Sequence, residues 1–387
     1  MSSAAASLPP VRILSAAAWG VRAQFFISGA LFATWGVHVP TVKAHFALGE
    51  QALAIAMLAA GAGALLALTQ AGRVVGRFGP RAVALCSGCL CALSVAALIA
   101  FQAYAALLAL MLVFGMASAL FDVAINAEAS EIERMAQRPL MSGFHAQFSL
   151  GGMAGAGLGA ALHAAAVPAH QHLWGAAAVG VLVVTLGCSA MLRLQGDPAS
   201  GGTMRLPRGA LALMGVLAAV GLISEGAMYD WSVLFMTQEL HSDAGTAALA
   251  YASFSAAMAA ARFGGDWVRS RLASVPLLQI SGTLAAAGMA LALLAGHPLV
   301  ALAGFACVGL GLANVVPVLF SAAARVPGVS PAHGIAAVAS LGYLGLMAGP
   351  PLVGVIAEAS SLTWGLSCIV LFAAMLALAA RRALPRS

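Results

Sequence analysis

Residues 51–101 read QALAIAMLAAGAGALLALTQAGRVVGRFGPRAVALCSGCLCALSVAALIAF. Two apolar runs, 51–72 and 82–101, are separated by a short loop that contains three arginines. A helix needs about 20 apolar residues to cross the hydrocarbon core of a bilayer. The alternating pattern of a membrane β-strand is absent from both runs. This stretch therefore predicts two transmembrane helices joined by a basic turn.

The composition of the whole chain agrees with this interpretation. Of its 387 residues, 62% are hydrophobic and only 8% are charged, and the mean hydropathy is +0.98. Soluble domains average about 25% charged residues. With 18 basic and 12 acidic side chains, the chain cannot build a charged surface. A soluble enzyme, a nucleic-acid-binding protein and a disordered chain are therefore excluded.

The chain contains twelve apolar runs long enough to span a membrane. Their approximate bounds are 20–40, 51–72, 82–101, 104–127, 143–166, 173–192, 209–236, 244–263, 275–295, 299–323, 333–356 and 363–381. We therefore predict an all-α polytopic membrane protein with 12 transmembrane helices.

The basic residues predict the orientation of these helices. All Lys and Arg residues except Lys43 fall in segments predicted to lie on one side of the membrane. Short loops rich in Lys and Arg stay in the cytoplasm. Both termini are therefore expected to be cytoplasmic.

The longest polar interruption predicts where the chain divides. Residues 194–207 (LQGDPASGGTMRLP) are rich in Gly and Pro and lie near the middle of the sequence. We expect an N-terminal six-helix bundle over 1–193, a cytoplasmic linker over 194–207 and a C-terminal six-helix bundle over 208–387.

The two halves resemble each other. A shift of 194 positions aligns Arg77 with Arg271, Ser87-Gly88 with Ser281-Gly282, and Gly115 with Gly309. Two parallel six-helix repeats are typical of transporters in which two bundles rock about a central site.

The loop after the second predicted helix carries a recognisable motif. It reads GRVVGRFGPR and matches the signature GxxxDRxGRR at Gly72, Arg77, Gly79 and Arg81. On these residues the chain resembles the major facilitator superfamily of secondary transporters. The resemblance implies a two-bundle fold and a cytoplasmic latch at this loop. The sequence departs from the signature at Gly76, where the family has Asp, which puts the usual latch in doubt.

The corresponding loop of the second half keeps an acidic residue. Asp266 is spaced to reach Arg262 four residues earlier or Arg269 three residues later. By the same resemblance, Asp266 and Arg269 are expected to belong to the latch.

Residues 121–152 are similar to a little-characterised bacterial branch of the superfamily, placed near the fucose-permease-like proteins. This resemblance implies a multi-pass protein of the bacterial inner (plasma) membrane. We expect it to act as a monomer in the lipid bilayer, without nucleic acid, cofactor or metal.

Two acidic residues lie in the seventh predicted span. Glu225 is near its middle, where a charged group is costly and is typical of a proton or substrate site. Asp230, five residues later, is rotated away from Glu225 by about 140°. We predict proton coupling or substrate binding for both, the alternatives being a packing carboxyl for Glu225 and a gate or solvated helix end for Asp230.

A second polar group is predicted at the cytoplasmic ends of the fourth and fifth spans. Asp122 and Asn126 lie one turn apart on one helix, and His145 begins the next. They are expected to form a functional cluster or a structural network. Nearby Glu128, Glu131 and Glu133 are expected to be solvated and paired with Arg134 and Arg138.

Several other polar or aromatic residues are candidates to line a cavity, although tryptophan near a helix end is as often an interfacial anchor. They are Thr34, Trp35, His38, Tyr229, Trp231 and Asn314. Pro317 is expected to free a backbone carbonyl beside the same cavity. His172 is expected in a wet outer loop.

No enzymatic or nucleotide-binding motif is visible in the sequence. Lys43 is the only lysine and has no glycine-rich loop before it, and HExxH and GxSxG are absent. The chain is therefore predicted to be a secondary transporter and not an enzyme. A membrane-embedded enzyme or a sensor is the remote alternative.

The predicted substrate follows from the charges at membrane depth. The sequence places acids there and no Lys or Arg, which disfavours anions. We predict proton-coupled symport of a small neutral solute, sugar-like or a polyol. The alternative is proton-driven export of cationic or amphipathic compounds.

Overall fold

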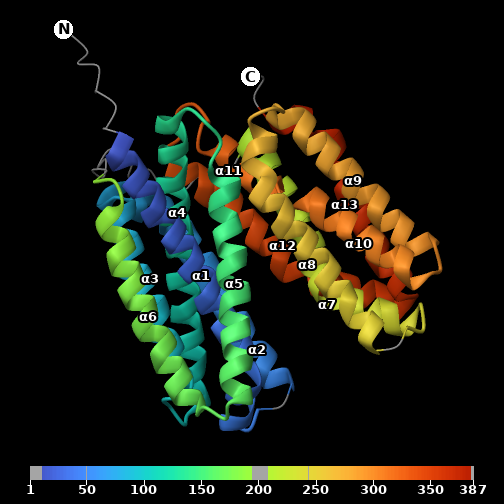
Figure 1. The fold of residues 1–387 in the computed structure, drawn as a ribbon, viewed down its shortest axis with the longest axis horizontal. Helices are drawn as coiled ribbons and strands as arrows, with labels where there is room; N and C mark the ends of the chain where they lie inside the picture. Colours follow the sequence, from blue (N-terminus) through green and yellow to red (C-terminus); the bar gives the residue numbers. More distant parts are fainter. Residues whose placement is uncertain (1–10, 49, 194–207, 243, 385–387) are drawn as a thin grey trace. The chain divides into compact units, whose positions relative to one another are not determined.

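The computed structural model describes residues 11–48, 50–193, 208–242 and 244–384. Over these ranges the chain forms thirteen α-helices joined by short connections (Figure 1). The helices are α1 (Val11–His45), α2 (Glu50–Phe78), α3 (Pro80–Ala96), α4 (Tyr104–Ala136), α5 (Met141–Ala164), α6 (Ala169–Ala190), α7 (Ala210–Gln238), α8 (Ala244–Arg269), α9 (Ser274–Leu294), α10 (Pro298–Leu312), α11 (Val315–Ala323), α12 (Pro331–Ala359) and α13 (Leu362–Ala383).

Each predicted span coincides with a helix, and one prediction needs correction. The run 299–323 was expected to be a single helix, whereas the chain breaks at Ala313 and Asn314 between α10 and α11. Counted as one span, these two helices bring the total to twelve, so the predicted all-helical fold is confirmed.

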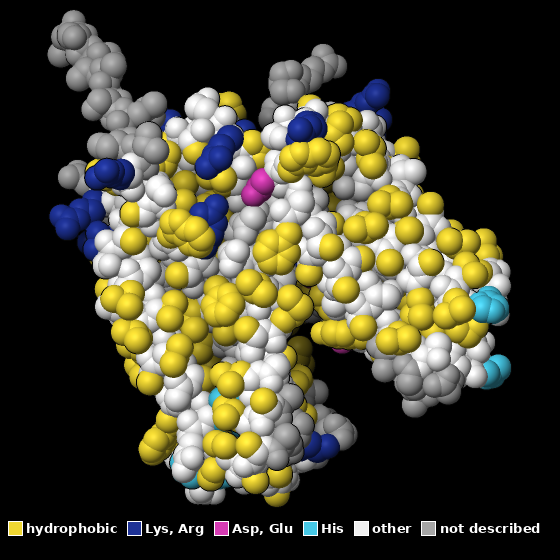
Figure 2. All heavy atoms as spheres, in the orientation of Figure 1, with side chains coloured by type: hydrophobic (Ala, Val, Ile, Leu, Met, Phe, Trp, Pro, Cys, Tyr) yellow, Lys and Arg dark blue, Asp and Glu magenta, His cyan; other side chains and the backbone are white. Residues whose placement is uncertain are grey.

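Eight of the spans in the described residues are long and apolar enough to cross a membrane. Their outward surfaces carry large apolar side chains such as Leu182, Leu371 and Leu378, which are 57%, 67% and 81% exposed. In each unit, the visible face is covered by hydrophobic side chains over its middle, while Lys and Arg gather toward one end (Figure 2). This surface suits lipid and not water.

Residue contacts divide the chain into two compact units. Unit 1 comprises Met1–Leu140 and Gln147–Gly202, and unit 2 comprises Met141–Ala146 and Thr203–Ser387. The first six residues of α5 thus group with unit 2 and the rest of that helix with unit 1. The predicted linker, 194–207, lies outside the described residues, so the predicted domain boundaries stay a prediction.

Within unit 1, α5 lies beside α1 and runs parallel to it (Figure 1). Small residues allow the two backbones to touch: a Cβ atom added at Gly151 would lie 1.8 Å from the Phe26 carbonyl oxygen, and one at Gly155 would lie 2.7 Å from the Ala30 carbonyl oxygen. Such close approach is how membrane helices pack without a hydrophobic driving force.

A second close approach in unit 1, between α2 and α4, has an equivalent in unit 2 between α8 and α10. Gly115 of α4 packs on the Ala60 carbonyl of α2, and Gly309 of α10 packs on the Phe254 carbonyl of α8. Both members of the second pair lie 194 residues after their counterparts. The internal repeat inferred from the sequence is therefore visible in the packing.

Residues at the end of α4 behave differently from the sequence prediction. Glu128 and Glu133 are buried, at 0% and 2% exposed, and accept hydrogen bonds from the backbone N–H groups of Leu192 and Leu140. Glu131 forms the expected exposed pair, with Arg134. The helix spacing indicated which carboxylates could reach an arginine. It could not indicate that the backbone N–H groups of Leu140 and Leu192 would need these carboxylates as hydrogen-bond acceptors.

The contact between α1 and α5 generates a stability prediction. Gly151→Ala should lower the stability of the purified protein by about 1–3 kcal/mol, because the methyl group must push two backbones apart. The measurement is the apparent melting temperature in detergent.

Gly157, on the same helix, is the matched control because a Cβ there meets nothing within 4 Å. Gly157→Ala should leave stability unchanged or raise it by up to about 1 kcal/mol through helix propensity. Equal melting temperatures for the two variants would contradict the packing described.

Candidate functional site

The polar centre of unit 2 is an ion pair between α7 and α8. The Arg262 Nη2 atom lies 3.3 Å from Oε1 and 3.4 Å from Oε2 of Glu225. The two side chains are only 11% and 16% exposed. Two opposite charges so far from water stabilise each other, and the cost of burying either alone would be high.

A break in the tenth span supplies a further partner to this arginine. Pro317, in the first turn of α11, has no N–H to donate to the Ala313 carbonyl four residues earlier. The Nε–H group of Arg262 donates to that carbonyl instead, over 3.5 Å. Arg262 therefore connects the helix break to Glu225.

This arrangement corrects the predicted charge distribution. Arg262 was counted among the basic residues on the cytoplasmic side, because the eighth span was predicted to end at about residue 263. In the structure α8 continues to Arg269 and keeps Arg262 buried, at 9% exposed. The inference that no Lys or Arg lies at the depth of Glu225 was wrong. The argument that excluded anionic solutes falls with it.

Aromatic residues lie one turn beyond Glu225. The Tyr229 ring packs on Tyr251 and Phe254, with centroids 5.0 and 5.1 Å apart. Asp230 is exposed, on a different side of α7 from Glu225. The Trp231 indole lies against Gly354, and its buried Nε1 atom has no hydrogen-bond partner among the described residues.

The start of α5 is held by the last turn of α8. The backbone N–H groups of Ser142 and Gly143 donate to the Asp266 carboxylate over 2.9 and 2.7 Å. The Ser142 hydroxyl donates to the Asn314 side-chain oxygen over 2.7 Å. An acid at a helix N-terminus satisfies free N–H groups and the helix dipole.

Arg269 completes this part of the predicted latch. Its Nη1 atom lies 3.5 Å from Asp266, and Nη2 donates to the Ser321 hydroxyl over 2.8 Å. The sequence identified Asp266 and Arg269 but missed Ser142 and Gly143. The sequence signal for this contact was Gly265. A Cβ there would lie 2.2 Å from the Asn314 side-chain oxygen and 2.6 Å from the Ser142 Cβ, so the close approach requires glycine.

The first-half motif forms a sharp connection in unit 1. Gly79 alone separates α2 from α3, with a φ of 78° that favours glycine, and Pro80 begins the next helix. The Arg77 guanidinium lies over the Phe78 ring at 5.3 Å. Gly72 lies within α2 and Arg81 within α3. A latch role for these four residues stays a prediction.

The predicted cluster of Asp122, Asn126 and His145 is divided between the two units. Asn126 donates to the carbonyl and carboxylate of Asp122 over 2.9 and 3.0 Å in unit 1. His145 belongs to unit 2, where its ring packs edge-on against Phe320. A joint role of the three residues stays a prediction.

The candidate residues of α1 are buried. Thr34 donates to the Ala30 carbonyl, and Trp35 packs on Phe114. His38 lies 2.8 Å from His172, ring nitrogen to ring nitrogen. The prediction that His172 lies in a wet loop was wrong: it is 6% exposed, because α6 begins at Ala169.

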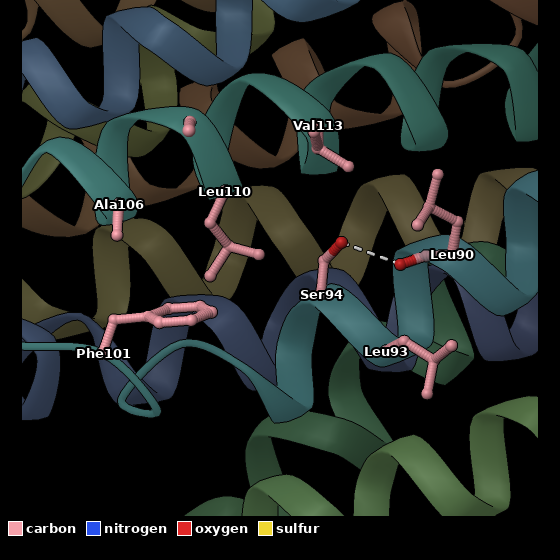
Figure 3. A pocket seen from close by; sticks show the side chains of 8 residues that line it. Leu90, Leu93, Ser94, Phe101, Ala106, Leu110 and Val113 are labelled. Carbon is pink, nitrogen blue, oxygen red and sulfur yellow. Dashed lines mark hydrogen bonds between the residues drawn. The ribbon is translucent and has the colours of Figure 1, made fainter.

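The hollow between α3 and α4 does not have the features of a solute site. Its volume is about 370 Å³, and the side chains around it are apolar apart from Ser94, whose hydroxyl donates to the Leu90 carbonyl of its own helix (Figure 3). A hollow without free polar groups cannot orient a polar solute. Among the described residues, no three His, Cys, Asp or Glu side chains are grouped to hold a metal ion.

Comparison with known proteins agrees with this architecture. The sequence profile of the Major Facilitator Superfamily matches residues 21–208. The chain is 34% identical to an uncharacterized MFS-type transporter of Yersinia pestis, covering 93% of this chain and 94% of the relative. It is 32% identical to the membrane protein MosC of Rhizobium meliloti, covering 90% and 86%.

Solved structures show the same fold at low identity. FucP in the outward conformation, which is described as a fucose:proton symporter, superposes with a TM-score of 0.81 at 16% identity, covering 95% of this chain and 99% of that one. The proton:xylose symporter XylE gives 0.75 at 11% identity, covering 97% and 96%.

The ion pair generates a second stability prediction. Arg262→Met should lower the free energy of unfolding by about 1–3 kcal/mol, because it leaves the partly buried Glu225 carboxylate without this hydrogen-bond donor. Adding Glu225→Gln should recover part of this loss, since no lone charge then remains. Thermal unfolding in detergent measures both.

Arg382, exposed at the end of α13, provides the control. Arg382→Met should change stability by less than about 0.5 kcal/mol. If Arg262→Met is as stable as this control, the pair does not exist in the folded protein.

Proposed function

Because the chain belongs to the major facilitator superfamily, a family of secondary transporters and not of enzymes, we propose that it couples solute movement to protons through Glu225. The superfamily assignment makes it a multi-pass membrane protein that binds a small solute. The coupling ion, the solute and the direction are our proposal.

The observation that carries the proposal is the pairing of Glu225 with Arg262 at 3.3 Å. As a carboxylate, Glu225 neutralises the guanidinium and holds α8 against α7. A proton on Glu225 removes the ionic part of this interaction between α7 and α8. An ion pair that forms and breaks with one proton gives the two states that coupling requires.

The pair also bears on the nature of the solute. With both partners charged the net charge is zero, so a neutral solute can approach without an unpaired charge. Tyr229 and Trp231 add flat faces and polar tips suited to a hydroxylated ring. We therefore favour a neutral sugar-like or polyol substrate moved by proton symport. Two neighbours of the same fold are named as fucose and xylose symporters.

Export of cationic compounds is the weaker alternative. It relied on acids without a basic partner at membrane depth, and Glu225 already has Arg262 as its partner. The same arginine favours a different second candidate, an anionic solute that pairs with Arg262 once Glu225 is protonated. A substrate screen must therefore include anions.

Orientation and the remaining site residues complete the proposal. We propose that the basic ends face the cytoplasm, with both termini there, and that the protein acts as a monomer. We retain Asp230, Asp122, Asn126 and His145 as secondary polar candidates.

The experiment is transport by protein reconstituted in proteoliposomes. Thermal-shift screening against sugars, polyols, amino acids, organic anions and drugs, starting with fucose and xylose, identifies the radiolabelled probe. Glu225→Gln should abolish accumulation driven by a pH gradient while leaving counterflow within about twofold of wild type, because counterflow needs no net proton movement.

The control variant is Glu358→Gln, which removes a carboxyl group near the end of α12. It should accumulate the probe as wild type does. Undiminished accumulation by Glu225→Gln would overturn the coupling role, and accumulation of a cation against a pH gradient would favour export.

A further inference from the structure

The break between α10 and α11 is a property of the second repeat and not of the fold. Its counterpart in the first repeat, α4, is continuous from Tyr104 to Ala136. At an offset of 194, Pro317 corresponds to Val123 and Arg262 corresponds to Leu68, and both of these first-repeat side chains are fully buried. The equivalent close approaches at Gly115 and Gly309 form in both repeats. The break is therefore not needed for that shared packing.

The break and the arginine depend on each other. Without an N–H at Pro317, the Ala313 carbonyl would face a low-dielectric interior with no helical donor, which is costly. The Arg262 Nε–H supplies that donor over 3.5 Å. The side chain that replaces the missing helical hydrogen bond is thus the one that pairs with Glu225.

The guanidinium group makes this second contact consequential. It is planar, and its N–H donors point in fixed directions. An Arg262 whose Nε–H is bound to the Ala313 carbonyl therefore has its Nη2 atom directed at Glu225, 3.3 Å away. A free side chain would lose this alignment to rotamer entropy.

We propose that Pro317 is a positioning residue for proton coupling: it frees the Ala313 carbonyl, which holds Arg262 on Glu225 and so sets the pH range in which Glu225 exchanges its proton. This inference rests on the proposed function of Glu225.

Other titratable or charged groups lie on α7 and α8, on the helices in contact with them and at the start of α5. They are Tyr229 on α7, Tyr251, Asp266 and Arg269 on α8, His145 on α5, Cys307 on α10, Tyr343 on α12 and Cys368 on α13. Tyr229 and His145 interact electrostatically with Arg262. All of these groups remain in the variants below, so they do not account for a difference between them.

The test is an infrared titration of the protein in lipid vesicles, which needs no substrate. The carbonyl band of protonated Glu225 is identified by its loss in Glu225→Gln. Pro317→Ala restores an N–H for the Ala313 carbonyl and turns that carbonyl back along the helix axis. Arg262 then favours the carboxylate less, and half-protonation of Glu225 should move to higher pH by about 0.5–1 pH unit.

Two further variants separate positioning from general disturbance. Pro298→Ala removes a proline at the first position of α10, where no carbonyl depends on it, and should leave the midpoint unchanged. Arg262→Lys keeps the positive charge but removes the planar guanidinium group, and it should raise the pH at which Glu225 is half-protonated. Adding Pro317→Ala to Arg262→Lys should change this pH little further. If the Pro317→Ala variant does not yield folded protein, Pro317→Gly supplies the same backbone N–H group.

The outcomes are distinguishable. An unchanged midpoint in the Pro317 variants, or full additivity with Arg262→Lys, would refute the positioning role. That result would leave the coupling role of Glu225 intact, since coupling is tested separately by accumulation in Glu225→Gln.

Discussion

The interaction on which the second unit depends is the bridge that Arg262 makes between Glu225 and the Ala313 carbonyl. It satisfies two groups that would each be costly in a membrane protein, a carboxylate and a carbonyl without a helical donor. The two needs are met by one guanidinium, so a change at either acceptor alters the other. A single proton can therefore affect both α8 and the broken span.

The two repeats show what this bridge adds to the fold. Their helices approach through small residues at matching positions, as at Gly115 and Gly309, and this framework is apolar in both. The first repeat has Leu68 where the second has Arg262. Packing is thus shared between the halves, whereas the ion pair and the helix break belong to one. This asymmetry separates what forms the fold from what we propose drives transport.

The sequence predicted the fold well because its strongest signals are local. Runs of about 20 apolar residues and basic loops depend only on neighbours in the chain. The site was harder to predict because its partners are distant in sequence. Glu225 was identified from its depth, but Arg262, 37 residues later, looked like a loop cation until the length of α8 was known.

Other misassignments have the same cause. His172 is buried because α6 begins at Ala169, and Glu128 is buried because it accepts a hydrogen bond from Leu192, just after α6 ends. The ends of helices are the weakest part of a sequence-based prediction. Pro317 was recognised as a source of a free carbonyl, yet the donor to that carbonyl could not be identified, because Arg262 lies 51 residues earlier in the chain than Ala313. Patterns within one helix gave reliable local predictions, whereas contacts between helices required the structure.

The most direct measurement of the central claim is the nitrogen chemical shift of Arg262 Nε, followed by solid-state NMR of labelled protein in lipid as the pH is varied. If Arg262 bridges Glu225 and the Ala313 carbonyl, this shift should change in one step as Glu225 takes up its proton, and the step should vanish in Glu225→Gln. A shift that stays constant across the pH range, or that changes equally in the variant, would contradict the account.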